Sequence, residues 1–178
     1  IKIEFNDRYN QASTYHQLGI VAEALREYEQ ARSHYQQALD IKIEFNDRYS
    51  QASTYHQLGS VAEALREYEQ ARSHYQQALD IEIEFNDRYS QASTYFQLGK
   101  VAEATENFAE ASAYYLEDLQ ISVESNDENG LGITLRNLAR FYKAHPDDNF
   151  LADAAHRLNA TTEQLREFIE NQGDDNPQ

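Results

Sequence analysis

The chain has 178 residues, enough for one folded domain, and a formal net charge of −16. A surface this acidic repels phosphate, which argues against general nucleic-acid binding. Cysteine is absent, no apolar run approaches the ~18 residues of a membrane span, and no signal peptide is visible. We therefore expect a cytoplasmic protein that does not act in the membrane. Methionine is absent even at position 1, from which we expect a fragment of a longer chain.

The chain is built on a repeat with a period of 40 residues. Residues 1–40 and 41–80 differ only at two positions, Asn10/Ser50 and Ile20/Ser60. Residues 81–120 begin in the same way, with IEFNDRYSQASTYFQLG, and diverge afterwards. Residues 1–5 match residues 41–45, which end a repeat, so we expect the parent protein to have more repeats upstream.

Each period contains two helical patterns. Apolar residues at steps of three and four positions mark one face of the first helix, as at Tyr15, Leu18, Ala22 and Leu25. We expect first helices over 7–24, 47–64, 87–104 and 128–144, and second helices over 28–44, 68–84 and 107–124. Asn46-Asp47 predicts a helix N-cap, because short side-chain oxygens accept hydrogen bonds from the first amides. Asn126-Asp127 repeats this pair.

Two positions predict special packing. Gly19 recurs as Gly59 and Gly99 inside the first helix, where glycine costs roughly 1 kcal/mol relative to alanine. Close approach to a neighbouring helix is the expected reason. Asp118 stands where the repeat otherwise packs alanine, which predicts a local shift in burial.

Beyond the fourth first helix, the sequence no longer follows the repeat. Pro146 predicts the helix end, because proline disfavours helix at the residue before it. A short helix follows at Leu151–Leu158, then a capping-box signature at Thr161 and Gln164, then a last helix. A solenoid needs an end that covers its last apolar face, so we expect a cap here. A helix-turn-helix DNA reader is the alternative, although the last helix is acidic.

The repeat resembles the tetratricopeptide repeat family over about 140 of the 178 residues. The resemblance rests on the aromatic–x–x–Leu–Gly motif and on small or aromatic packing residues, namely Tyr15, Leu18, Gly19, Ala22, Ala31, Tyr35 and Ala38. The family period is about 34 residues, and Arg26 and Ile43 replace its customary glycine and proline. The 40-residue form is similar to the mitotic GoLoco-binding adaptors. It is also similar to the C-terminal arrays of large bacterial signalling or defence (STAND-type) ATPases and caspase-like proteins.

This resemblance implies an all-α, right-handed superhelical solenoid of antiparallel helix pairs with a C-terminal helical cap. We expect the end of a truncated upstream repeat over 1–5, and repeats over 6–45, 46–85 and 86–125. A degenerate fourth repeat with capping helices should occupy 126–171, before a flexible tail over 172–178. A terminal repeat has only one stacking neighbour, so we expect Tyr9 and Tyr15 to be incompletely covered and the first repeat to be the least stable.

The resemblance also implies that the chain binds a protein or peptide, as the sensor or partner-recruiting end of a larger bacterial signalling or defence protein. Two alternatives are a passive scaffold or oligomerisation spacer and a nucleic-acid reader acting through the C-terminal helices. The open edge of the first repeat would also allow self-association. No nucleic-acid or membrane partner is expected.

In this family the first helices line the concave, ligand-binding surface, so their exposed strip is the candidate site. One position of the strip reads Ile20, Ser60, Lys100 and Arg140 in successive repeats, and another reads His16, His56, Phe96 and Arg136. Neutral drift and selection in a recognition groove both account for this variation. The candidate residues are Ser13, His16, Gln17, Ile20, Glu23, Ser53, His56, Gln57, Ser60, Glu63, Ser93, Phe96, Gln97, Lys100, Glu103, Arg136, Asn137, Arg140 and Lys143.

Arg136, Arg140 and Lys143 share one face of the fourth first helix. We expect them to form, with Lys100, a basic patch on the inner surface. The glutamates of the strip, Glu23, Glu63 and Glu103, would keep the other end of the groove acidic. A basic residue near a helix C-terminus also favours the helix dipole, which is an alternative explanation for Lys143.

No pattern indicates catalysis, a cofactor or a metal, so we expect a protein that is not an enzyme. His16 and His56 occupy equivalent places, but the set then continues with Phe96 and Arg136, whereas zinc needs at least three protein ligands. We interpret the two histidines as duplicated surface residues. Carboxylate pairs repeat identically on polar faces, as solvated surface does. No phosphate-binding loop, nucleophile elbow or Cys–His arrangement is present.

Overall fold

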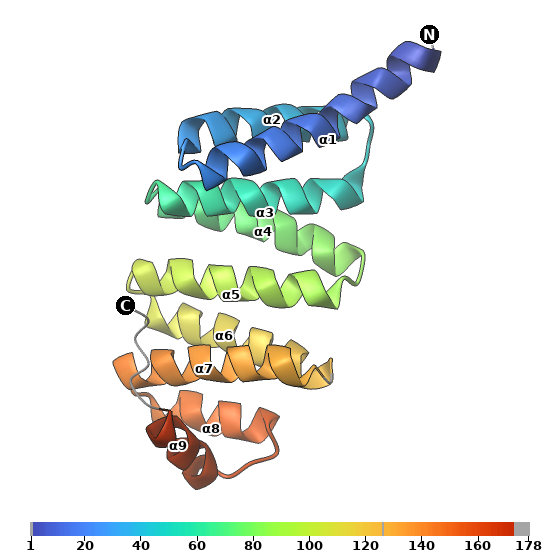
Figure 1. Cartoon of the computed structure of the whole chain (residues 1–178). Helices are drawn as coiled ribbons and strands as arrows, with labels where there is room; N and C mark the ends of the chain where they lie inside the picture. The colour runs from blue at the N-terminus through green and yellow to red at the C-terminus, as the bar shows by residue number, and fades with distance from the viewer. Residues whose placement is uncertain (1, 126, 173–178) are drawn as a thin grey trace.

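The computed structural model describes residues 2–125 and 127–172, with side chains from residue 7 onward. All regular structure in these ranges is helical (Figure 1). The helices are α1 (Lys2–Ala24), α2 (Tyr28–Glu44), α3 (Arg48–Ala64), α4 (Tyr68–Glu84), α5 (Arg88–Ala104), α6 (Phe108–Glu124), α7 (Glu128–Ala144), α8 (Asp148–Arg157) and α9 (Thr162–Asn171). No helix in the described ranges is long and apolar enough to cross a membrane.

The helices stack in chain order along one axis (Figure 1). α1 pairs with α2, α3 with α4 and α5 with α6, and the second helix of each pair packs on the first helix of the next. The expected all-α solenoid is therefore confirmed. From α2 to α7, every helix also begins and ends within one residue of its expected bounds.

The start of α1 differs from the expectation. The helix is continuous from Lys2 to Ala24, without the break expected near residue 6. The matching segment at Ile41–Phe45 ends α2 where the chain turns to begin α3. At the start of α1 the equivalent residues are helical and continue into the rest of the helix without a turn. The side chains of the expected stub, residues 1–5, lie outside the described residues.

The turns within and between pairs use the left-handed backbone region without glycine. Arg26, Arg66 and Glu106 have φ near 60°, and Asn46 and Asn86 have φ of 54° and 53°. After each of them the next amide bonds the carbonyl five residues earlier, as in Glu67 N–H to Ala62 O at 2.8 Å, which is a Schellman helix end. Glycine is usual at this position, and its absence made these breaks hard to see in the sequence.

The expected Asn-Asp capping pair divides into two roles. Asn46 ends α2, and Asp47 alone caps α3 by accepting from the Ser50 amide at 3.2 Å. Asp87 caps α5 in the same way. Asp127 caps α7 by accepting from the Asn129 amide, while Asn126 lies outside the described residues.

The small residue inside each first helix allows a tyrosine to approach closely, as expected. A Cβ placed on Gly59 would lie 2.6 Å from Cε1 of Tyr75, and Gly19 and Gly99 face Tyr35 and Tyr115 in the same way. The tyrosine is fully buried, and its hydroxyl donates to a glutamate of the first helix, at 3.1 Å from Tyr75 to Glu63. Each helix pair is thus locked by one aromatic ring.

The N-terminal end of the stack leaves apolar surface uncovered. Leu58 is 3% exposed because the α1–α2 pair covers it, whereas its counterpart Leu18 is 43% exposed. Val21 and Leu25 are also exposed. Tyr9, which is 40% exposed, is incompletely covered as expected, but the open end is not the reason, because Tyr49 is 54% and Tyr89 is 84% exposed. Tyr15 is half-buried, as Tyr55 and Tyr95 are. The exposed apolar surface at the N-terminal end of the stack is therefore formed by Leu18, Val21 and Leu25.

The 40-residue spacing of the helices continues for one helix more than expected. α8 begins 40 residues after α6, in the register of a second helix. In this last unit Ala139 and Ala155 stand where the earlier repeats have the glycine and the tyrosine. α8 forms no close pair with α7 and packs on α6 and α9 instead.

The two last helices cover the end of the solenoid. Leu151, Leu165 and Ile169 are buried in one cluster with Leu138 and Phe141 of α7. α9 begins with the predicted capping box, in which the Gln164 amide donates to Thr161 Oγ1 at 3.2 Å and the Thr161 amide donates to Gln164 Oε1 at 2.8 Å. The C-terminal cap is therefore present. The expected tail lies outside the described residues after Gln172.

Candidate partner-binding groove

Three equivalent pockets lie between consecutive first helices, and the preceding second helix forms the floor of each. We name them by a floor residue. The Lys42 pocket, between α1 and α3, has a volume of about 280 Å³. The Glu82 pocket, between α3 and α5, has about 310 Å³, and the Asp118 pocket, between α5 and α7, has about 620 Å³. Together they form a groove that crosses the first helices.

The expected strip of site residues divides between two regions. The groove pockets are lined by Ser13, His16, Ser53, His56, Gln57, Ser93, Phe96 and Asn137. A separate, open pocket of about 690 Å³ near the turn end of the first helices is lined by Glu63, Phe96, Lys100, Glu103 and Arg140. The other expected residues, Gln17, Ile20, Glu23, Ser60, Gln97, Arg136 and Lys143, line none of these four cavities.

The expected basic patch is contradicted at two of its four residues, because glutamates of the preceding repeat neutralise Lys100 and Arg140. Lys100 Nζ lies 2.7 Å from Glu63 Oε1, and Arg140 binds Glu103 through both guanidinium nitrogens at 2.7 and 2.8 Å. Lys143 donates to the carbonyl of Gln172. The Arg140 guanidinium also lowers the pKa of Glu103. Two of the three glutamates expected to form an acidic end, Glu63 and Glu103, are the partners in these ion pairs, so that end is largely neutralised too.

The variable position Ile20, Ser60, Lys100 and Arg140 ties one repeat to the next. Ser60 Oγ donates to Glu23 of the preceding repeat at 2.7 Å, just as Lys100 and Arg140 bind Glu63 and Glu103. The same glutamate accepts from its own buried tyrosine, at 2.8 Å from Tyr35 to Glu23. Variation at this position therefore changes the contact between repeats. Ile20 has no preceding repeat in the structure and is exposed.

The floor position of the groove carries a change that the sequence reasoning missed. Lys42, Glu82 and Ser122 are equivalent, and all three are buried. Lys42 Nζ donates to the Ser50 carbonyl at 2.8 Å and to Thr54 Oγ1 at 2.7 Å. Glu82 Oε1 accepts from Thr94 Oγ1 at 3.0 Å, and its Oε2 has no partner among the described residues. Burial lowers the pKa of Lys42 and raises the pKa of Glu82 to about 7.

A signal for this position was present in the sequence. Residues 41–55 and 81–95 differ only at Lys42/Glu82. A reversal of charge in an otherwise constant frame was visible, but the candidate site was sought only on the first helices, and this position lies on the second helices. Within the described part of the chain, neither side chain has an ion-pair partner. Burying an unpaired charge is costly, so the pair is a candidate for function.

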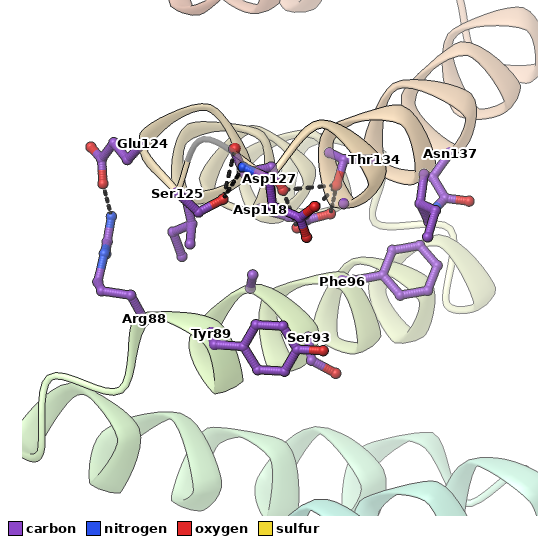
Figure 2. Close-up of a pocket in the computed structure, with 15 residues that line it drawn as sticks. Arg88, Tyr89, Ser93, Phe96, Asp118, Glu124, Ser125, Asp127, Thr134 and Asn137 are labelled. Carbon is purple, nitrogen blue, oxygen red and sulfur yellow. Dashed lines mark hydrogen bonds and ion pairs between the residues drawn. The ribbon is translucent and has the colours of Figure 1, made fainter.

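The Asp118 pocket has an acidic floor between aromatic and apolar walls (Figure 2). Asp118 is buried, contrary to the expected shift in burial, and two buried hydroxyl groups, those of Thr134 and Ser122, lie beside its carboxylate. Its carboxylate accepts from Thr134 Oγ1 at 3.3 Å and from Ser122 Oγ at 3.5 Å. Burial raises the pKa of Asp118 to about 6. In Figure 2, Tyr89 and Phe96 on α5 lie opposite Thr134 and Asn137 on α7.

One replacement explains why the Asp118 pocket is open. Tyr49 packs on Phe85, with ring centroids 5.3 Å apart, and its hydroxyl donates to Asp87 at 3.0 Å. Tyr9 packs on Phe45 in the same way. At the third junction Ser125 stands in place of this phenylalanine, and Tyr89 is 84% exposed. The loss of a ring therefore leaves a tyrosine exposed at the mouth of the pocket.

The two groove histidines are fixed in place and half-buried, so their interpretation as surface residues is wrong. His16 Nδ1 lies 3.4 Å from Thr54 Oγ1, and His56 Nδ1 lies 3.0 Å from Thr94 Oγ1. Their rings pack on Tyr35 and Tyr75. Burial lowers the pKa of both histidines. The described residues contain no group of three His, Cys, Asp or Glu side chains arranged to hold a metal ion.

Stacked helix pairs with a groove across their first helices define a helical-repeat protein. Two tetratricopeptide repeat models match the sequence, one over residues 11–44 and one over residues 50–122, together more than half of the chain. The chain belongs to the tetratricopeptide repeat family. Proteins of this family are in general protein-interaction modules and are typically non-catalytic.

One similar solved structure is the crystal structure of BtubC (BKLC) from P. vanneervenii. The similarity has a TM-score of 0.69 and 22% sequence identity, and it covers 90% of this chain and 65% of that one. At this identity the likeness concerns the fold alone. No curated protein matches the chain.

Proposed function

We propose that this protein binds an extended segment of a partner protein in the groove, anchored by one side chain in the Asp118 pocket. The observation that carries the proposal is the open Asp118 pocket itself. Its volume of about 620 Å³ is in the range of ligand sites. Two of its wall residues are large and exposed, Tyr89 at 84% and Ile133 at 55%. Exposed apolar surface around a cavity is typical of an interaction site.

The lining of the pocket suits a side chain with an apolar body and a hydrogen-bond donor at its tip. Phe96, Ile121 and Ile133 provide apolar contact. At the floor, Asp118 offers carboxylate oxygens, and carboxylates accept hydrogen bonds. The nearby cation Arg88 binds Glu124, so its charge is compensated.

The wider context is also a proposal. By resemblance to bacterial signalling and defence arrays, we infer a cytoplasmic module without catalytic activity that recruits or senses a partner for a larger protein. A nucleic-acid reader at α8–α9 has less support, because the arginines of these helices bind residues of α6 and α7. Arg157 donates to the Leu116 carbonyl at 2.9 Å, and Arg166 donates to Tyr142 Oη at 3.0 Å.

A random-peptide phage library selected on the immobilised protein tests the groove. Replacing Ile133 by serine should weaken binding of the enriched peptides roughly tenfold or more, because truncating an anchoring contact commonly costs over 1 kcal/mol. The matched control is Ile83→Ser on α4, which is 52% exposed and lines none of the groove pockets. Equal affinity of the two variants would show that the peptides bind elsewhere.

Self-association through the N-terminal face is the second candidate, favoured by the exposed Leu18, Val21 and Leu25. In dilute protein, amides of α1 should exchange with solvent roughly tenfold or more faster than the equivalent amides of α3, since burial of one leucine contributes about 1.5–3 kcal/mol. Self-association would slow exchange in α1 as protein concentration rises. Equal exchange of Leu18 and Leu58 in a monomeric sample would contradict the lower stability of the first repeat.

A further inference from the structure

Two hydrogen-bond relays connect the buried floor of the groove to its surface. The first runs from Lys42 through Thr54 to His16, and the second from Glu82 through Thr94 to His56. The threonines and histidines are equivalent residues in adjacent repeats. The relays thus differ only in the charge at the buried end.

In the first relay the hydrogen-bond direction follows from the ammonium group, which can only donate. Lys42 Nζ donates to Thr54 Oγ1 at 2.7 Å. The single proton of Thr54 is then available for His16 Nδ1, 3.4 Å away. The hydrogen bonds of the described residues give this proton no other acceptor, so we assign Nδ1 of His16 as the acceptor, and the neutral ring carries its proton on Nε2.

In the second relay the direction reverses above about pH 7, where Glu82 is ionised, because a carboxylate oxygen only accepts. Thr94 Oγ1 donates its only proton to Glu82 Oε1 at 3.0 Å. Thr94 can then only accept from His56, whose Nδ1 lies 3.0 Å away. The His56 proton is therefore on Nδ1, which leaves a lone pair on Nε2.

We propose that the buried charge sets the polarity of the histidine above it, so that the groove orients an extended peptide with an acidic side chain over His16 and a basic one over His56. This proposal rests on the groove function proposed above. Both rings line their pockets, and neither Nε2 has a hydrogen-bond partner within the described part of the chain. His16 Nε2 offers a proton to a carboxylate, and His56 Nε2 accepts one from an ammonium or guanidinium group.

The charges around the two rings favour the same arrangement. Lys42 acts on His16, whereas Glu23 and Glu63 act on His56. An anion is thus favoured at the first junction and a cation at the second. Packed helices lie roughly 10 Å apart, and an extended or polyproline chain advances about 3 Å per residue. The acidic and basic residues of the ligand should therefore be about three positions apart.

Nuclear magnetic resonance of the protein labelled with ¹⁵N-histidine tests the relays directly. Long-range ¹H–¹⁵N correlations distinguish the two tautomers, and His16→Gln and His56→Gln assign the signals. At about pH 8, where Glu82 is ionised, we expect Nε2–H at His16 and Nδ1–H at His56. The decisive variant is Glu82→Lys, which recreates the Lys42 junction and should convert His56 to Nε2–H. The same tautomer at both positions in the original protein, or no conversion in the variant, would overturn the proposal.

The phage library tests the ligand class. On the original protein, the enriched peptides should carry an acidic and a basic residue about three positions apart. On Glu82→Lys they should carry two acidic residues instead. Enrichment with an unchanged charge pattern would overturn this inference and leave peptide binding in place. No enrichment on the original protein would contradict the groove function itself.

Discussion

Replacing Gly59 by alanine should destabilise the protein, although the same change usually stabilises a helix by about 1 kcal/mol. The new Cβ would lie 2.6 Å from Cε1 and 2.7 Å from Cδ1 of Tyr75. That ring is fully buried, and its hydroxyl is bound to Glu63, so it has no low-energy position to move to. Overpacking of this kind costs about 1–3 kcal/mol, measured as a lower midpoint in urea unfolding.

The matched control is Gly132→Ala in α7. The nearest atom to a Cβ there is Arg136 Nη1 at 3.7 Å, so alanine fits and should stabilise by up to about 1 kcal/mol. Combining Gly59→Ala with Tyr75→Ala recreates the Ala139 and Ala155 pair of the last unit. The double variant should be less destabilised than the sum of the single variants. A Gly59→Ala protein as stable as the original would show that the ring does not lock the helix pair.

Glu82→Gln should stabilise the protein at alkaline pH and have much less effect in mild acid. Burial raises the pKa of Glu82 from 4.5 to about 7 in the folded state. As pH rises from about 4.5 to about 7, the unfolded chain loses this proton first, so stability falls across that window. At 1.36 kcal/mol per pKa unit, the folded protein loses up to about 3 kcal/mol, which glutamine would restore.

Chemical unfolding at about pH 5 and about pH 8 measures this difference. Glu69→Gln, an exposed residue of the same helix, is the control and should change stability by less than about 0.5 kcal/mol at either pH. The direction of the pH dependence is informative. A carboxylate stabilised by hydrogen bonds or cations would make the folded protein more stable as pH rises, which is the opposite of what we expect for Glu82. If Glu82→Gln shifts both measurements equally, the carboxyl does not titrate as its burial indicates.

The helices could be predicted closely because their apolar residues recur with helical spacing and because the repeats confirm one another. From α2 to α7 the helix ends were also predicted to within one residue, although no glycine marks them. The turns use Arg26, Arg66 and Glu106 in the left-handed region, and arginine or glutamate at such a place gives no sequence signal. α8 escaped detection as a second helix because its alanine, Ala155, replaces the tyrosine that marks the pattern elsewhere.

The candidate site was predicted only in part. The strip of first-helix residues did include His16, His56 and Phe96, which line the groove. Lys100 and Arg140 were misread, because sequence spacing on one helix does not show which glutamate of the preceding repeat lies beside it. Lys42 and Glu82 were missed because they lie on the second helices, whereas the candidate site was sought on the first helices alone.

Because each junction is assembled from residues one period apart, the pocket is a property of the repeat and not of the whole chain. Duplicating forty residues would add a complete pocket whose floor carries the charge of the copied unit. A single substitution between lysine and glutamate at the floor position would then reverse the charge of that pocket and leave the neighbouring pockets unchanged. An array of this kind can change its length by duplication of a repeat and its preference for charge by a point substitution, and the two changes are independent.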